Sequence, residues 1–436
     1  MKLLIYADID SPRLRYVCHQ VFGIWFGWEY DYTTNSEVFL RYEGVALNYS
    51  KCRIKQKEVF IPNSDFLNAS EIHPIEKSFV KQHKIPASFT SETAEIIREG
   101  DLLAAIFFHL SRYEEYLAFD PDQHGRFTAQ QSWNYKNGTL KIPIVDQLVQ
   151  VLYQSFHTIF ENIPPLKRTF TKMPTYDIDM AWAYLHKGVF RNIAGIAKQV
   201  QKKEWTHLKN RVAVITRQQV DPYQTFPLLE TWHQAYHHSP IYFFLLGKYS
   251  TYDKNISPSN PLFRQLIQQI ASQYPIGIHP SYLSNNSPQQ LQVEIETLAT
   301  ISNQRIHRSR QHFLKLHLPT TYRQLLQNGI QQDYSMGYAD AIGFRAGTSQ
   351  SFYWYDLEKE ERTELLVHPF QIMDVTLKEY LNLSPTEAME EIKEMIDTIK
   401  TTKGTFCSLW HNSSFSYIGG WEEWKAVYEF LLEYGD

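Results

Sequence analysis

The spacing of hydrophobic and polar positions divides the chain into two regions. The first, residues 1–165, opens with the strand-like run Leu3–Ala7 and continues through segments of alternating character such as Val38–Tyr42. Apolar residues recur at intervals of three and four over Asp101–Leu117, which predicts a helix, and a second helix is expected over Val145–Phe160. We expect a small α+β domain here.

The second region, residues 166–436, begins within the proline-containing linker Ile163–Arg168. Short apolar runs then alternate with helical segments, a pattern typical of a sheet of mainly parallel strands wrapped by helices. Two helix starts are marked by Ser287–Gln290 and Ser384–Glu387, which have capping-box spacing and proline at the first helical position. The expected strands are Phe170–Asp179, Ile241–Leu246, Pro275–His279, Phe313–Leu316, Leu365–Met373 and Thr405–Trp410.

Composition narrows the class of protein. A hydrophobic content of 43% over 436 residues supports folded cores, and a formal net charge of −4 without a long basic run gives no support for nucleic acid as a partner. The widely spaced Cys18, Cys52 and Cys407 indicate neither a disulfide framework nor a zinc–cysteine site. Because the sequence has no apolar stretch long enough for a signal peptide or a membrane span, we expect a cytoplasmic protein.

The first candidate for chemistry is a pair of carboxylates at a strand end. In parallel sheets, functional groups collect where strands end at the carboxyl edge. Asp177 and Asp179 end the first strand of the second region, and a period of two sends both side chains to one face. Two carboxylates this close favour a bound cation, with one as ligand and the other as base. The alternative is a solvated strand end.

Two histidines follow other predicted strands. His279 comes directly after Ile276–Ile278, and His411 directly after Thr405–Trp410. Neutral imidazole is among the commonest zinc ligands, although a core histidine bonded to backbone is the alternative for His279. Three separate strands that each deliver Asp or His to one edge favour a metal site over chance.

In this order, the segments resemble the motifs of the polysaccharide deacetylase superfamily, carbohydrate esterase family four, across the second region. Thr175–Asp179 resembles the Asp-x-Asp variant of the opening motif, which implies Asp177 as general base and Asp179 as metal ligand. His279 resembles the first histidine of the His-Ser/Thr-x-x-His motif, another ligand. His411 resembles the histidine of the last motif, a general acid toward the leaving amine. The resemblance implies an α/β fold, an irregular (β/α) barrel.

One position departs from the motif. Leu283 stands four residues after His279, where the second histidine ligand is expected. Catalytic zinc normally takes three protein ligands and keeps one open position for water. We expect His312 to replace the missing ligand, with Ser281, Ser284 and His307 as further candidates.

Further segments complete the resemblance. Arg310 resembles the arginine of the third motif, which implies that it orients Asp177, and its planar fork can hold a carboxylate at two points. An ordinary basic helix end is the alternative. Asp333–Asp340 and Gly343–Thr348 resemble the segment that lines the substrate groove. Trp410 either flanks an acetyl pocket or packs in the core.

The implied function is a metal-dependent hydrolase, using Zn²⁺ or another divalent transition metal, that removes N-acetyl or O-acetyl groups from a saccharide or glycan precursor. A backbone N–H near Tyr282 is expected to stabilise the oxyanion. Hydrolysis of another amide or acyl ester stays open, as does a saccharide-binding or scaffolding protein with an impaired site. A cytoplasmic location favours a nucleotide- or lipid-linked substrate. The charged segments Ser111–Tyr116 and Asp120–Arg126 are interpreted as solvated, without assigned chemistry.

Overall fold

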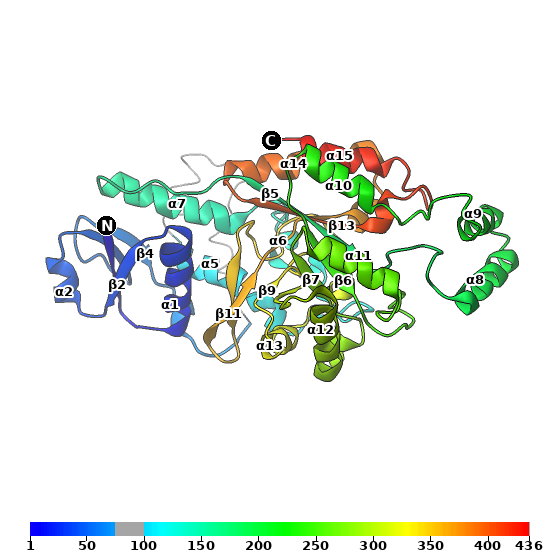
Figure 1. Ribbon diagram of the computed structural model, residues 1–436. Coiled ribbons are helices and arrows are strands. Elements are labelled where there is room, and N and C mark those ends of the chain that lie inside the picture. The colour runs from blue at the N-terminus through cyan, green and yellow to red at the C-terminus, as the bar shows by residue number, and fades with distance from the viewer. Residues whose placement is uncertain (75–99, 436) are drawn as a thin grey trace.

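The computed structural model describes residues 1–74 and 100–435, which form two β-sheets covered by helices (Figure 1). The first sheet and its helices comprise β1 (Lys2–Ala7), α1 (Pro12–Cys18), β2 (Glu29–Thr33), α2 (Ser36–Arg41), β3 (Val45–Ser50), β4 (Val59–Pro62), α5 (Leu102–Leu110), α6 (Trp133–Lys136) and α7 (Ile144–Ile159). The second sheet contains β5 (Thr171–Ile178), β6 (Ile241–Leu245), β7 (Ile276–His279), β8 (Arg308–Ser309), β9 (Gln332–Asp333), β10 (Phe352–Asp356), β11 (Glu361–Val367), β12 (Ile372–Met373) and β13 (Thr405–His411). Its helices are α8 (Val189–Gln201), α9 (Trp205–Ile215), α10 (Phe226–Ala235), α11 (Pro261–Ala271), α12 (Pro288–Ser302), α13 (Thr320–Gln327), α14 (Pro385–Thr401) and α15 (Trp424–Glu433).

The first sheet has the strand order β2-β1-β3-β4, and all of its pairings are parallel. The first region is therefore α/β, and the expected α+β arrangement is wrong. The segment Val38–Tyr42 is not a strand, because most of it lies in α2. The side chain of Asn35 accepts hydrogen bonds from the amides of Glu37 and Val38 and so begins this helix. Only Phe39 of the helix is buried, so the apparent alternation did not reflect a sheet face.

The second sheet has the order β10-β11-β9-β8-β7-β6-β5-β13-β12 and is parallel except for the β10–β11 hairpin. In Figure 1, α10, α14 and α15 lie on one side of it and α12 and α13 on the other. This confirms the expected mainly parallel sheet wrapped by helices. Strand pairings among residues 1–74 and 100–435 do not join β12 to β10, so closure into a barrel stays a prediction.

Two expected strands differ from the structure. Phe313–Leu316 is wrong: residues His312–Leu314 form a tight 3-10 turn in which Phe313 and Leu314 have φ values of 59° and 52°. The expected strand Leu365–Met373 is two strands, because His368, Pro369 and Phe370 interrupt it between β11 and β12. Proline has no N–H for a sheet ladder, which explains the break.

The predicted helices agree with the structure better than these two predicted strands do. The helix expected over Asp101–Leu117 ends at Leu110, since Arg112 has a left-handed φ of 54° and a 3-10 turn follows. The helix over Val145–Phe160 matches α7. Ser287 and Ser384 cap α12 and α14 as expected, and Ser384 forms the complete capping box with Glu387.

The charged segment Ser111–Tyr116 is buried, which corrects the expectation of a solvated helix end. Glu115 accepts hydrogen bonds from Arg112 at 2.8 Å and from Arg345 at 2.9 and 2.6 Å. Burial raises the pKa of the Glu115 carboxyl, but the guanidinium groups of Arg345 and Arg112 outweigh it and lower this pKa to about 2. The network joins the first region to the loop that carries Arg345.

Other contacts also connect the two regions. Arg13 on α1 forms an ion pair with Glu360 next to β11, and one hydrophobic core runs through both sheets. The boundary near residue 165 stays a prediction. None of the helices formed by residues 1–74 and 100–435 is both long and apolar enough to cross a bilayer.

We expect Glu115→Gln to lower the free energy of unfolding by about 3–5 kcal/mol, because two buried guanidinium groups lose their shared carboxylate. Urea denaturation measures the change. The matched control is Glu364→Gln, since Glu364 pairs with Arg362 at the surface and should contribute less than about 1 kcal/mol. Equal losses in both variants would contradict a structural role for the buried network.

Candidate metal centre

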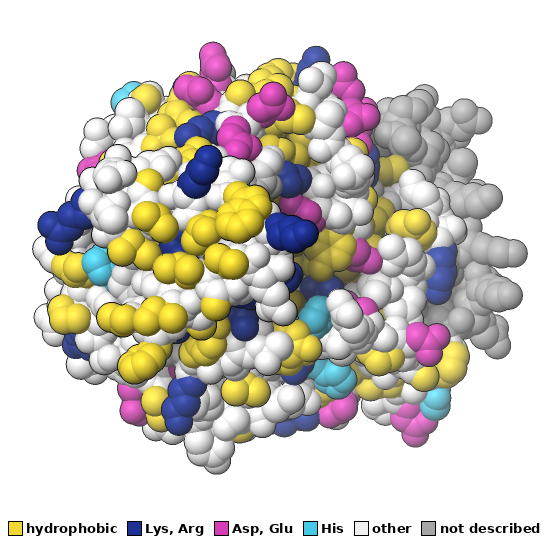
Figure 2. Space-filling model, turned by 90° about the vertical axis from the view of Figure 1, so that its right-hand side faces the viewer, with side chains coloured by type: hydrophobic (Ala, Val, Ile, Leu, Met, Phe, Trp, Pro, Cys, Tyr) yellow, Lys and Arg dark blue, Asp and Glu magenta, His cyan; other side chains and the backbone are white. Residues whose placement is uncertain are grey.

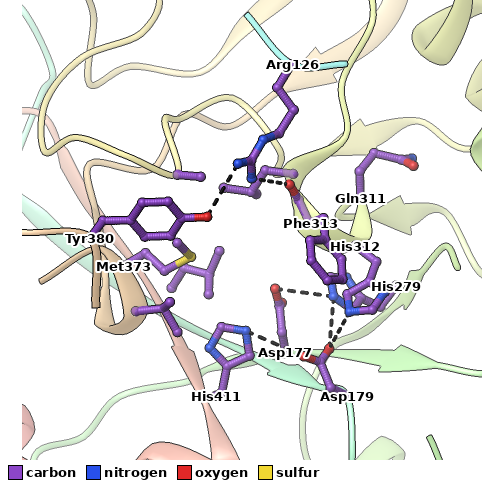
Figure 3. Close-up of a pocket in the computed structure, with 14 residues that line it drawn as sticks. Arg126, Asp177, Asp179, His279, Gln311, His312, Phe313, Met373, Tyr380 and His411 are labelled. Carbon is purple, nitrogen blue, oxygen red and sulfur yellow. Dashed lines mark hydrogen bonds and ion pairs between the residues drawn. The ribbon is translucent and has the colours of Figure 1, made fainter. Parts of the chain in front are cut away.

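The strand order places the candidate residues at one edge of the second sheet. β13, β5, β6, β7 and β8 are consecutive and parallel, so their carboxyl ends lie together. His411 on β13 is paired in register with Asp177 on β5. Asp179 follows β5, His279 ends β7 and His312 lies three residues after β8. Four separate segments therefore deliver their side chains to one place, as Figure 3 shows.

Asp179, His279 and His312 have the geometry of a ligand set. One potential ligand atom from each residue lies within 4.8 Å of the other two. The Nε2 atoms of His279 and His312 lie 3.2 and 3.7 Å from the Asp179 carboxylate. Both histidines are buried, whereas Asp179 is partly exposed toward the cavity. His312 thus lies close enough to Asp179 and His279 to share an ion with them, and its role as a ligand stays a prediction.

Neighbouring oxygens fix the orientation of both imidazoles. His279 Nδ1 lies 2.6 Å from the carbonyl oxygen of Arg310, and His312 Nδ1 lies 2.9 Å from the carboxylate of Asp253. Since these oxygens accept hydrogen bonds, Nδ1 carries the proton in each ring. Nε2 is then the ring nitrogen that lies toward Asp179, and a metal bound there would take the place of its proton.

The charges at this centre suit a cation. Burial disfavours protonated His312, but the carboxylates of Asp179 and Asp253 outweigh it and raise its pKa to about 9. Burial also raises the pKa of Asp179, yet nearby imidazoles hold it well below the usual range. Asp179 Oδ1 is buried and accepts no well-formed hydrogen bond. A divalent metal would satisfy this oxygen and both Nε2 atoms together, so the residues fit the implied Zn²⁺.

Asp177 lies beside the ligand set without belonging to it. Its carboxylate is 3.6 Å from His279 Nε2 and accepts a 3.2 Å hydrogen bond from Arg310 Nη1. The expected two-point grip is absent, because the same Nη1 also donates to Thr175 at 2.6 Å and Arg310 Nε donates to the Tyr334 carbonyl. Arg310 is fully buried and holds Asp177 from behind the cavity.

His411 faces the ligand set from the other side. Its Nε2 lies 3.8 Å from Asp179, and its Nδ1 lies 2.9 Å from the buried carboxylate of Asp374. Burial opposes protonation, but Asp374 and then Asp179 raise the pKa of His411 to about 10. The imidazole is therefore charged at neutral pH and can give up a proton.

These residues line a cavity of about 160 Å³. Part of its wall is apolar, formed by Leu314, Ala339, Met373, Val375 and Leu409. Trp410 does not line it, because its ring is buried and stacks on Phe415 in the core. Of the two segments expected to line a groove, Asp333–Asp340 contributes Ala339 here, while Gly343 packs against Leu140.

The remaining ligand candidates have other roles. Leu283 is exposed, Ser281 donates a hydrogen bond to Glu294, and Ser284 donates to the Ser281 carbonyl. His307 lies outside the ligand set. The amide of Tyr282 itself donates to Asp253 at 2.9 Å and is not free to bind an oxyanion, while a neighbouring backbone N–H in that role stays a prediction.

Sequence reasoning missed four residues of this centre. Asp374 directly follows the expected strand Leu365–Met373, so the strand-end rule could have found it. Asp253 sits eight residues beyond β6 in a loop and gave no signal. Arg126 and Tyr380 line the cavity from distant parts of the chain.

Arg126 belongs to the first region, and its segment Asp120–Arg126 had no assigned chemistry. Arg126 donates a 2.8 Å hydrogen bond to the Phe313 carbonyl, and its guanidinium lies 3.4 Å from the Tyr380 hydroxyl (Figure 3). Left-handed backbone costs roughly 1–2 kcal/mol per non-glycine residue, and Phe313 and Leu314 both adopt it. Arg126 thus stabilises the strained turn that carries His312.

Comparisons with known proteins match parts of the chain. A family of unknown function, DUF7033, matches residues 3–161. A search of curated proteins finds no match.

Several solved structures are similar to the chain. A Mycobacterium smegmatis protein assigned as a polysaccharide deacetylase has 12% identity and a TM-score of 0.40, covering 63% of this chain and 87% of that one. A 4-alpha-glucanotransferase from Thermococcus litoralis has 14% identity and a TM-score of 0.37, covering 62% and 37%. A polysaccharide deacetylase from Bacillus cereus has 10% identity and a TM-score of 0.29, covering 61% and 86%. Similarity this low assigns no function to the chain.

We expect His312→Ala to weaken Zn²⁺ binding by more than about 100-fold, because it removes a ligand, and Asp253→Asn to weaken it by about 10–100-fold, because it removes only the group that orients this ligand. Isothermal titration calorimetry measures both. His307→Ala is the matched control, and an equal loss there would contradict the assigned ligand set.

Proposed function

We propose that the chain is a metal-dependent hydrolase that removes a small acyl group, with acetyl on a saccharide or glycan precursor as the substrate suggested by the motif resemblance. One observation carries the proposal: Asp179, His279 and His312 form a ligand set between a carboxylate held by Arg310 and an imidazole held by Asp374. A base and an acid thus flank a cation site at the wall of one cavity. This is the arrangement that metal-assisted hydrolysis of an amide or ester needs.

Asp179, His279 and His312 would hold a divalent metal, which would polarise the substrate carbonyl and lower the pKa of a bound water toward neutrality. Asp177 takes the proton from the attacking water, because it is the carboxylate beside the ligand set that Arg310 orients. Thr175 and the Tyr334 carbonyl hold the Arg310 side chain in turn. The base is therefore fixed before substrate arrives.

His411 gives a proton to the leaving group. The carboxylates of Asp374 and Asp179 raise the pKa of His411 although burial lowers it. The imidazole therefore stays charged until the leaving nitrogen or oxygen gains negative charge. Asp374 accepts from Nδ1 and so directs Nε2 toward the cavity. Ser414 also donates a 2.5 Å hydrogen bond to Asp374, which keeps this carboxylate in place.

The cavity limits the size of the group removed. Its volume of about 160 Å³ is below the roughly 300–1,000 Å³ of pockets that enclose a drug-sized ligand. A short acyl group can lie against the apolar wall of Met373, Val375 and Leu409, while the rest of the substrate stays outside. The complete ligand set also favours an enzyme over a saccharide-binding protein with an impaired site.

We expect Asp177→Asn to lower kcat by about 100- to 10,000-fold and to leave Zn²⁺ affinity within about tenfold of wild type, because Asp177 is a base and not a ligand. Deacetylation of N-acetylated oligosaccharides and calorimetric zinc titration measure the two effects. Asp397→Asn, at an exposed position on α14, is the control. Full activity in Asp177→Asn would defeat this role.

We expect Asp374→Asn to move the basic limb of the kcat/KM–pH profile to lower pH. The neutral amide removes the negative charge that raises the pKa of His411, so the acid form of His411 is lost at a lower pH. The acidic limb should stay in place, because Asp177 is untouched. A shift of the acidic limb alone would show that His411 is not the acid.

A further inference from the structure

Residues 186–220 form a helical hairpin, made of α8 and α9, that projects from the second sheet. The hairpin begins seven residues after Asp179 and lies at the far end of the molecule from the first sheet (Figure 1). Arg191 fastens it to the neighbouring loop by donating to the carbonyls of Lys254 and Asn255, at 3.2 and 3.0 Å. The hairpin and the metal centre therefore belong to the same edge of the sheet.

Polar side chains link the two helices. Arg211 on α9 donates 2.9 Å hydrogen bonds to Gln199 and Asn192 on α8. Gly195 permits this close approach, because a Cβ there would lie 2.7 Å from the Arg211 guanidinium. In an ordinary helical hairpin the apolar faces meet each other, whereas this polar contact leaves many of the apolar residues outside.

Many apolar residues of both helices face outward, although Val214 is buried. Phe190 is 88% exposed, Val189 71% and Trp205 55%. Figure 2 views the molecule from the side on which the hairpin projects, and hydrophobic side chains gather there among Lys and Arg. The other exposed apolar residues of the hairpin and its end are Ile193, Val200, Val212, Ile215 and Val220. Monomeric proteins rarely expose so many apolar residues together, and such a surface is typical of an interaction site.

The hairpin is also strongly basic. Residues 186–220 contain eight Lys and Arg but only one acidic residue, Glu204, which gives a net charge of +7 in a chain of net charge −4. Lys198, Lys202, Lys203, Lys209 and Arg217 are exposed. The rest of the chain therefore carries a net charge of −11, and the positive charge is concentrated beside the exposed apolar surface.

We propose that the α8–α9 hairpin docks the protein onto an anionic lipid surface. Exposed Phe190 and Trp205 would enter the interface between headgroups and acyl chains, where aromatic rings are favoured, and the lysines would contact anionic headgroups. The hairpin lies on the membrane without crossing it. Face-to-face pairing of two copies through this surface fits less well, because it would bring two +7 charges together.

Docking in this way would bring the carboxyl edge of the second sheet to the membrane. Asp253, which orients His312, directly precedes Lys254 and Asn255, the two residues whose carbonyls hold Arg191. The loop at residues 253–255 thus contacts both the hairpin and a candidate ligand of the metal centre. The inference does not depend on hydrolase activity, and its test uses binding alone.

Sedimentation with vesicles tests the proposal. We expect the full chain to bind phosphatidylcholine vesicles that contain about one-third phosphatidylglycerol at least tenfold more tightly than phosphatidylcholine alone, and to lose this preference at high salt. The double variant Phe190→Ser/Trp205→Ser should weaken binding by at least about tenfold, since it removes buried apolar area. Lys202→Glu/Lys203→Glu should weaken it by a similar factor.

Two control variants distinguish vesicle binding through the hairpin from nonspecific vesicle binding. Leu40→Ser and Val293→Ser change exposed apolar residues on α2 and α12 and should leave vesicle binding unchanged. Binding that ignores lipid charge, or that survives both hairpin variants, would overturn the proposal. A concentration-dependent dimer that Phe190→Ser/Trp205→Ser abolishes, without vesicle binding, would assign the surface to a second copy and would also overturn it.

Discussion

The parallel alignment of five neighbouring strands is the constraint on which the candidate centre depends. β13, β5, β6, β7 and β8 all run the same way, so residues separated by more than two hundred positions reach one edge of the sheet. The edge gathers two carboxylates, Asp177 and Asp179, and three imidazoles, His279, His312 and His411, in a small volume. Such a group is stable only if protons or a cation balance the negative charge. Asp253 and Asp374 lie behind His312 and His411, and this second layer decides which nitrogen of each ring faces the cavity.

Most of the centre could be predicted because it obeys a rule of parallel sheets. Asp177, Asp179, His279 and His411 each end an apolar run, and the structure brings all four together. Their roles stay predictions. His312 was expected as a ligand, yet the element around it was not, since Phe313 and Leu314 look apolar enough for a strand and instead adopt left-handed backbone. A local pattern does not show when tertiary contacts will hold a strained turn.

The first region shows the limits of local patterns more clearly. The local sequence of Ser111–Tyr116 indicates a solvated charged segment. Glu115 instead pairs with Arg345, 230 residues away along the chain, and is buried. Arg126 likewise reaches Phe313, 187 residues away, and lines the cavity. Both pairings depend on how the two regions pack. The first region, to which the sequence assigned no chemistry, therefore contributes Arg126 to the cavity wall and supports the turn that carries the candidate ligand His312.

The central claim is that one divalent ion binds Asp179, His279 and His312 and keeps a position open toward Asp177. Anomalous diffraction from a zinc-loaded crystal tests it most directly. We expect one zinc peak at about 2.0–2.2 Å from the Nε2 atoms of His279 and His312 and from an oxygen of Asp179. A zinc peak that lies away from this edge of the sheet, or that omits His312, would contradict it.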